Sequence, residues 1–512
     1  MKFSDCIIDE LISGGVIPAI ECVQSISFAP PAPYDQYDCS VRINDRNLIS
    51  DSASFAFELI LECCTVGNYI NLQLNWTNLV DKLTSYITET DKEPYGYFES
   101  KFNGKNISVE HTSITPVYPI NLATFRSSVI GEALKNMFEF LGAKVQTHFF
   151  VEDLARQIEL LNRGVEATQV DLDSLPIGDK VDHLIGKLFA ATYSKCKNNT
   201  LVMDRLSAMF PYAGDVCFEK EIDNSSLLDN DKRKYLCEKC LIGHKETLQY
   251  TGIAIDSYDY ESEFAYDFDE VALKEPGVLR SLIAHSEKIP YYLRNCAYFA
   301  GMKLGCDEFY TIISDRQRAA INDTLDALSS TEGINVVFFG DVLVSDDDEK
   351  NALDSIKEGA FHSVDQYIET MAKSYNRSRD CIVKALKFKL LSTRLSKGCY
   401  IDDTEFNQHD SFFVILDFVQ DIKSGRNQSN SHKPEYDDTV KPLCRKMIQF
   451  EDVIHKVAIE KCFNLLADYV ESLYLEVKTY IEVSDNVLCL DSKLGRAVGS
   501  IFDTAFEILD IE

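Results

Sequence analysis

The stretch that decides the fold runs from Val109 to Leu161 and reads VEHTSITPVYPINLATFRSSVIGEALKNMFEFLGAKVQTHFFVEDLARQIELL. It begins with a strand-like run, passes through a turn that contains Pro116 and Pro119, and continues into a helix-like segment. A second strand-like run, KVQTHFF (144–150), follows. Apolar β-branched runs that alternate with amphipathic helices are typical of a parallel sheet with right-handed crossovers. The segment therefore predicts an α/β core.

The same alternation extends on both sides of this stretch, from about residue 106 to residue 404. Later strand-like runs are FYTIIS (309–314) and INVVFFGDVLV (334–344). Before the core, the runs CSVRI (39–43) and VGNYINLQL (66–74) indicate a smaller α/β module. After it, the blocks 410–424, 441–457, 459–483 and 488–511 have the apolar spacing of helices, with a polar linker at 425–438. We predict three domains, at residues 1–105, 106–404 and 405–512.

Composition and charge limit the functions that this chain can have. The chain has 512 residues, 45% of them apolar, and a formal net charge of −31. Such an acidic surface repels phosphate backbones except where basic residues gather locally. No apolar run approaches the roughly 20 residues of a membrane span, and the first residues lack a cleavage-site pattern. The 16 cysteines have no framework spacing, as expected of reduced thiols, so we expect a cytoplasmic protein without a membrane segment.

The Val109–Leu161 segment resembles the signature region of the archaeal-type class I arginyl-tRNA synthetases. In that family a strand ending in Val-Glu-x-Thr/Ser-Ser leads to the HIGH motif (His-Ile-Gly-His) and then to a helix of the form R-x-x-x-[IL]-G-[DE]-x-L. The resemblance implies a Rossmann-like doubly wound parallel sheet, an N-terminal additional domain and a C-terminal α-helical bundle of the anticodon-binding type. The frame is kept at Val109, Glu110, Thr112, Ser113, Pro116, Pro119, Arg126, Gly131, Glu132, Leu134, Gly142, Asp153 and Gln157.

The HIGH motif itself is replaced by Asn121, Leu122, Ala123 and Thr124. The resemblance implies that the imidazoles of an intact motif hold ATP and stabilise charge on its phosphates, while the glycine lets adenine approach the backbone. Asn121 and Thr124 can donate hydrogen bonds but carry no positive charge. Removing one such donor costs about two to four kcal/mol of barrier. We therefore expect adenylation to be lost.

The amino-acid pocket is altered in the same way. In the family a Tyr-x-x-Arg-Asp helix start presents a carboxylate to the substrate guanidinium, and this chain has Asn295 in that place. An amide cannot neutralise a desolvated guanidinium, and truncating one member of a buried pair costs about 3–5 kcal/mol. If Arg316 points into the pocket, it repels substrate arginine and favours an anionic ligand. By resemblance the pocket comprises Glu110, Ser113, Thr115, Tyr291, Asn295, Arg316 and Gln317.

The KMSKR loop, whose lysines neutralise pyrophosphate in the family, is also degraded. Alignment through Gly359 leaves only Ser355 and Lys357 to act there, and three aspartates (346–348) upstream have the wrong sign for phosphates. Some arginyl enzymes lack this motif, so its loss has weight only together with the changes at Asn121, Thr124 and Asn295.

Basic residues gather before and within the C-terminal helices. They are either solvated helix faces that balance an acidic protein or a residual stripe for an RNA backbone. The candidate RNA contacts are Lys384, Lys387, Arg394, Lys397, Lys441, Arg445 and Lys446, with Lys389 and Lys456 beside them.

One cysteine pair has the spacing of metal ligands. Cys237, Cys240 and His244 could supply three zinc ligands, but a structural site needs a fourth and no second pair follows at a suitable spacing. We predict no metal and no cofactor.

We therefore interpret the chain as an arginyl-tRNA synthetase-like pseudoenzyme. It would act as a tRNA-binding, regulatory or adaptor protein. Its expected partners are tRNA, bound weakly, and a protein such as a tRNA-modifying enzyme or a synthetase. The alternative is a functional arginine–tRNA ligase with a divergent active site, which would use ATP. A third hypothesis is an enzyme that acts on another amino acid or nucleotide.

Overall fold

The computed structural model describes residues 2–28, 37–50, 57–89, 94–173, 180–197, 230–266, 272–274, 291–344, 363–401, 412–424, 436, 438–484 and 493–512. The chain forms two compact units. The first combines residues 1–100 with residues 409–507 and 512, and the second contains residues 101–408 and 508–511.

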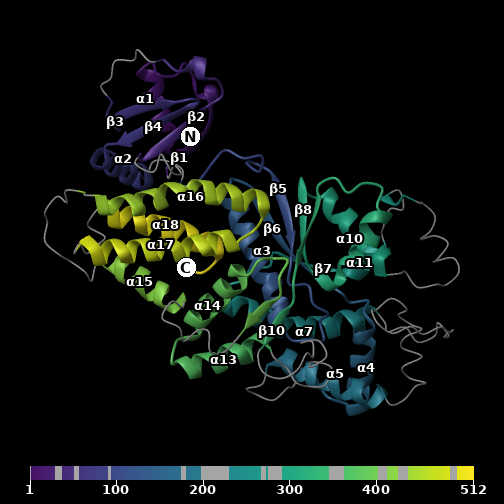
Figure 1. The fold of residues 1–512 in the computed structure, drawn as a ribbon. Coiled ribbons are helices and arrows are strands. Elements are labelled where there is room, and N and C mark those ends of the chain that lie inside the picture. Colours follow the sequence, from purple (N-terminus) through teal and green to yellow (C-terminus); the bar gives the residue numbers. More distant parts are fainter. Residues whose placement is uncertain are drawn as a thin grey trace. The chain divides into compact units, whose positions relative to one another are not determined.

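A five-stranded parallel sheet forms the centre of the second unit (Figure 1). Its strand order is β7-β6-β5-β8-β9, so the first strand along the chain lies in the middle and later strands are added on either side. This is the doubly wound order, and it confirms the predicted fold class. The strands are β5 (Asn106–Glu110), β6 (Lys144–Val151), β7 (Ser257–Tyr260), β8 (Glu308–Ser314) and β9 (Ile334–Phe339).

Alternating residues of β6 point into two different cores, as the period of a strand requires. Phe149 and Val151 pack in a cluster with α4, α5 and α7, whereas Phe150 packs with α10 and α11. Helix α3 packs against β5, β6 and β8. The helices of this unit are α3 (Leu122–Phe140), α4 (Arg156–Thr168), α5 (Val181–Lys197), α7 (Asn230–Tyr250), α8 (Glu261–Tyr266), α10 (Tyr291–Leu304), α11 (Arg318–Ala327), α13 (Val364–Tyr375) and α14 (Arg379–Ser392).

The run predicted as one strand at 334–344 is two strands. It breaks at Gly340 and Asp341, and the second part, β10 (Val342–Val344), pairs in parallel with β11 (Cys399–Ile401) in a separate small sheet. A Cβ on Gly340 would lie 2.6 Å from the carbonyl carbon of Lys397, so only glycine allows this approach. The carbonyl of Gly340 accepts a hydrogen bond of 2.7 Å from the guanidinium of Arg126. The break is therefore fixed by contacts that are distant in sequence.

The first unit contains a four-stranded antiparallel sheet of order β1-β2-β4-β3. The predicted strand 66–74 begins with a hairpin turn at Gly67 and Asn68, where Gly67 has a φ of 57° and Val66 pairs with Tyr69. The elements are α1 (Asp5–Ser13), β1 (Val23–Ser27), β2 (Cys39–Ile43), β3 (Ile60–Val66), β4 (Tyr69–Leu74) and α2 (Trp76–Thr88).

The C-terminal helices belong to the same unit as this sheet. Tyr95 stacks on Phe450 with ring centres 5.7 Å apart, and its hydroxyl donates to the carbonyl of Met447 at 3.0 Å. The backbone amide of Phe3 donates to the carboxylate of Glu451 at 2.8 Å. The helices are α15 (Phe412–Ser424), α16 (Lys441–Glu460), α17 (Asn464–Ser484) and α18 (Lys493–Leu509), which correspond to the four predicted helical blocks. Most of the predicted linker at 425–438 lies outside the described residues.

Among the described helices, none is both long enough and apolar enough to cross a membrane.

Candidate functional site

The candidate site lies where the strand order of the parallel sheet reverses. Strands β5 and β8 are neighbours there, and later strands extend away from them in opposite directions. In open α/β sheets, ligands bind beyond the carboxyl ends of the strands at this point. The residues that follow β5 include Ser113, Thr115 and the turn at Asn121, so two sets of predicted residues, the amino-acid pocket and the HIGH position, fall at this edge.

Asn121 is the N-cap of helix α3. Its side-chain oxygen accepts a hydrogen bond of 2.9 Å from the backbone amide of Thr124, and the residue is 5% exposed. The backbone amide of Phe125 donates to the carbonyl of Asn121 at 2.8 Å, and the amide of Val364, at the start of α13, donates to the carbonyl of Ile120 at 3.0 Å. Asparagine is a preferred N-cap because its side chain satisfies an amide that the helix leaves unpaired. The Asn121 side chain thus binds the helix's own backbone.

Glu110 closes strand β5 as a buried acid. It accepts hydrogen bonds from the hydroxyls of Ser113 and Thr311. Ser113 in turn accepts one of 2.9 Å from the backbone amide of Phe150. Burial raises the pKa of Glu110 to about 7 even though both hydroxyls favour the ionised form. This carboxyl can therefore gain or lose a proton near neutral pH.

A second acid, Asp259 on β7, is partly buried and is held by a histidine that the sequence did not suggest. The Nδ1 of His148 donates to Asp259 at 2.8 Å, and the hydroxyl of Tyr298 donates to the same oxygen at 3.1 Å. Burial tends to raise the pKa of Asp259, but the hydrogen bonds from His148 and Ser257 outweigh it and lower the pKa. The only available signal was a histidine inside the apolar run KVQTHFF.

A third acid, Glu261, is buried and forms an ion pair with Arg294, 2.6 Å between Oε1 and Nη1. Burial raises the pKa of Glu261 to about 8, although Arg294 favours the ionised form. Asn295, next on helix α10, is also buried, and its side-chain nitrogen has no hydrogen-bond partner in the part of the chain that the structure describes. The resemblance assigned Asn295 to the pocket, whereas no sequence pattern indicated the pairing of Glu261 with Arg294.

Two of the remaining predicted pocket residues bind acids other than Glu110, Asp259 and Glu261. Thr115 donates to Glu152 at 2.6 Å. Arg316 and Gln317 are exposed, and Arg316 forms an ion pair of 2.8 Å with Asp341. Arg316 is thus already neutralised by Asp341. The backbone of Tyr291 opens α10, while its side chain lies outside the description.

Two further predicted sets have different outcomes. Ser355 and Lys357 of the degraded KMSKR loop lie outside the described residues. Cys237, Cys240 and His244 are buried on α7, and burial raises the pKa of both thiols, which opposes the thiolate that zinc requires. His244 instead engages the carbonyl of Tyr118 through Nε2 at 2.8 Å.

The candidate RNA contacts of the second unit differ in their surroundings. Lys387 is 3% exposed and pairs with Asp510 at 2.5 Å, which removes it from any surface. Lys384 pairs with Asp380 at 3.0 Å, in the preceding turn of helix α14. Arg394 and Lys397 are exposed.

In the first unit, two candidate RNA contacts share one acid. Lys441 and Arg445 approach Asp38 at 3.3 and 3.4 Å, and both cations lie over the ring of Trp76. Lys446 lies 5.4 Å from the ring centre of Tyr469, and burial lowers its pKa. A phosphate group would have to compete with these existing contacts.

Comparison with known proteins gives a consistent family. No family model matches the chain. It is 26% identical over 458 residues to the arginine–tRNA ligase of Methanosphaera stadtmanae, covering 80% of this chain and 78% of that enzyme. It is 28% identical over 200 residues to the arginine–tRNA ligase of Methanobrevibacter smithii, a match that spans 39% of this chain and only 32% of that enzyme. The fold is similar to Thermus thermophilus arginyl-tRNA synthetase, with a TM-score of 0.69, 14% identity and coverage of 99% and 98% of the two chains.

Proposed function

Because the chain belongs to the arginyl-tRNA synthetase family, we propose that it is a member that has lost adenylation and acts as a cytoplasmic tRNA-binding or regulatory adaptor protein. The observation that carries this proposal is the start of helix α3. Asn121 stands where the family has the first histidine of its motif, and its side chain caps the amide of Thr124. A group committed to capping, and without positive charge, cannot stabilise a developing phosphate charge.

The three acids support the same proposal. Asp259 accepts hydrogen bonds from His148 and Tyr298, and Glu261 is paired with Arg294, so both carboxyl groups already have partners inside the protein. Glu110 has only hydroxyl partners and, with its raised pKa, is partly protonated near pH 7. A substrate guanidinium would therefore meet little uncompensated negative charge at this edge of the sheet.

A functional arginine–tRNA ligase is the second candidate. It is favoured by the length of the alignment with the Methanosphaera stadtmanae enzyme, 458 residues. Under this hypothesis other groups replace the missing histidines, and ATP would bind at the start of helix α3.

The first experiment measures ATP–pyrophosphate exchange with arginine and tRNA. We expect background activity for the unmodified chain, because the charge at the helix start is missing. Robust exchange would establish the second candidate and end the pseudoenzyme proposal.

The second experiment measures arginine binding by calorimetry. We expect no binding at millimolar arginine for the unmodified chain. Asn295→Asp should improve affinity at least tenfold, because Arg316 is paired with Asp341 and does not oppose a cation in the pocket. Asn295→Gln, which changes size without adding charge, is the matched control. Equal affinities for the two variants would mean that position 295 lies outside the pocket.

The third experiment tests binding of tRNA at low salt. Arg394 and Lys397 are the exposed candidates, so reversing both to glutamate should weaken binding without unfolding the protein. The affinity should fall with salt by roughly 0.9 in the log–log slope for each phosphate contact to a duplex. If no complex forms, or if the reversal has no effect, the RNA role is wrong for this surface and a protein partner remains.

A further inference from the structure

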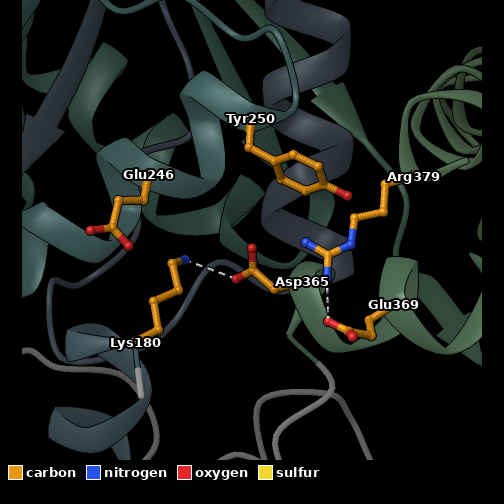
Figure 2. Close-up of a pocket in the computed structure, with 6 residues that line it drawn as sticks. All are labelled: Lys180, Glu246, Tyr250, Asp365, Glu369 and Arg379. Atoms are coloured by element: carbon orange, nitrogen blue, oxygen red, sulfur yellow. Dashed lines mark hydrogen bonds and ion pairs between the residues drawn. The ribbon is translucent and has the colours of Figure 1, made fainter. Parts of the chain in front are cut away.

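A cluster of three potential metal ligands lies in the second unit, away from the sheet edge described above. It comprises Asp182 and His183 at the start of α5 and Asp365 in the first turn of α13. Their ligand atoms all lie within 4.8 Å of one another. The ammonium of Lys180 points at Asp365, as Figure 2 shows.

We propose that Asp182, His183 and Asp365 form a binding site for one divalent metal ion, and that the ammonium of Lys180 competes for the same position. This inference goes beyond the proposed function and does not depend on it.

The contacts of Lys180 indicate where a cation is stable. Its Nζ lies 2.9 Å from Oδ2 of Asp365 and 3.4 Å from Oδ2 of Asp182, and it also donates to the hydroxyl of Thr247. Nε2 of His183 is 3.2 Å from the same oxygen of Asp365. Two carboxylates and one imidazole therefore surround a position of positive charge. With one ammonium, the charge of the two carboxylates is only half balanced.

Asp182 provides a second, independent observation. It is 1% exposed, and its Oδ1 has no hydrogen-bond partner among the described residues. A buried carboxylate oxygen without a partner is costly, and an ion is one of the few groups that would satisfy it. Gly243 on the facing helix leaves space for this side chain, since a Cβ there would lie 2.2 Å from Oδ1. The site thus has a buried ligand and a backbone that accommodates it.

A cavity beside the cluster provides access and room for water ligands. Its volume is about 200 Å³. One imidazole with two carboxylates suits a divalent ion such as Mn²⁺ or Zn²⁺, with water completing the coordination. The lining residues are Lys180, Glu246, Tyr250, Asp365, Glu369 and Arg379 (Figure 2).

The test uses Mn²⁺ and the full chain. Zn²⁺ is unsuitable as a first probe because the chain has 16 cysteines, whose sulfur would bind it elsewhere. Bound Mn²⁺ is measured from the loss of the free-ion signal in electron paramagnetic resonance. We expect one site per chain, and at least tenfold tighter binding for Lys180→Met because the competing ammonium is gone. Adding His183→Ala to that variant should weaken binding at least tenfold.

Lys373→Met is the matched control, because it removes the same charge from an exposed ion pair with Glu369 on helix α13. If Lys180→Met binds Mn²⁺ no more tightly than Lys373→Met, the proposal is wrong. Loss of Lys180 also leaves two carboxylates facing each other, so this variant should melt earlier without Mn²⁺ and recover in its presence. Failure of Mn²⁺ to restore the melting temperature would overturn the proposal by a separate measurement.

Discussion

Replacing Arg126 with methionine tests how much the buried guanidinium contributes to the α/β unit. The side chain is 0% exposed. Its Nη1 donates to the carbonyls of Gly340 and Lys397, at 2.7 and 2.9 Å. Its Nη2 donates to the carbonyls of Arg394 and Thr393, at 3.1 and 3.3 Å. Methionine fills a similar space but donates nothing, so four carbonyls lose a charged partner.

The expected loss follows from two opposing effects. A hydrogen bond to a charged group contributes about 1.5–3 kcal/mol. Burial of the guanidinium is itself unfavourable, as its lowered pKa indicates, so these contributions do not simply add. Truncating one member of a buried charged contact costs about 3–5 kcal/mol in comparable cases. Because unfolding free energies are typically about 5–15 kcal/mol, Arg126→Met should lower the urea midpoint by at least about 1 M.

Circular dichroism in urea provides the assay, and Arg316→Met provides the control. Arg316 forms an exposed ion pair with Asp341, and such pairs contribute about 0–1 kcal/mol. Arg126→Lys keeps the charge but loses the planar fork, so it should fall between the two. If Arg126→Met unfolds at the same urea concentration as Arg316→Met, the guanidinium does not hold these segments together, and this reasoning fails.

Three further predictions concern other contacts. Arg445→Glu should destabilise the first unit by about 2 kcal/mol or more, because it places a like charge next to the buried Asp38. The control Lys456→Glu, at an exposed position, should change stability by about half a kcal/mol. Equal melting temperatures for the two variants would contradict this. Burial raises the pKa of Glu451 from 4.5 to about 7, so its stabilising contribution is complete below pH 4.5 and is lost as the pH rises through 7. As the pH rises from 5 to 8, Glu451→Gln should therefore gain up to about 3 kcal/mol of unfolding free energy relative to the unmodified chain. Urea midpoints that change with pH by the same amount in both proteins would contradict this prediction. Gly131→Ala should lower stability by about 1–3 kcal/mol, since its Cβ would lie 2.3 Å from the ring of buried His111. Gly305→Ala, whose Cβ would lie 3.6 Å from the carbonyl oxygen of Met302, should lower the melting temperature less.

Elements with strong local patterns were predicted correctly from the sequence. The strands at Lys144–Val151 and Glu308–Ser314 are apolar runs between helices, and pattern alone identifies them. The run 334–344 also looks like one strand, yet it breaks at Gly340 because Arg126, 214 positions away, binds the carbonyl there. Local periodicity carries no information about such a partner.

The candidate site shows the same limit. Glu110 and Ser113 were assigned to one pocket by resemblance, and in the structure the hydroxyl of Ser113 donates to the carboxyl of Glu110. His148 and Asp259 are 111 positions apart and were missed, although they form one of the central contacts at this edge. Arg445 was predicted as an RNA contact from local basic composition, but it pairs with Asp38, 407 positions away. Basic side chains that form a cluster in the sequence can thus already be paired with acids inside the folded protein.

Trp76 is the only tryptophan in the chain, and the cations of Lys441 and Arg445 lie 5.7 and 5.5 Å from the centre of its ring. Its fluorescence therefore originates from one place, the junction between helix α2 and helix α16 of the first unit. Charge next to an indole shifts its emission, so any ligand that draws these two side chains away from the ring changes the spectrum. Tryptophan emission can therefore be used to measure the binding of polyanions near α2 and α16 without an added dye.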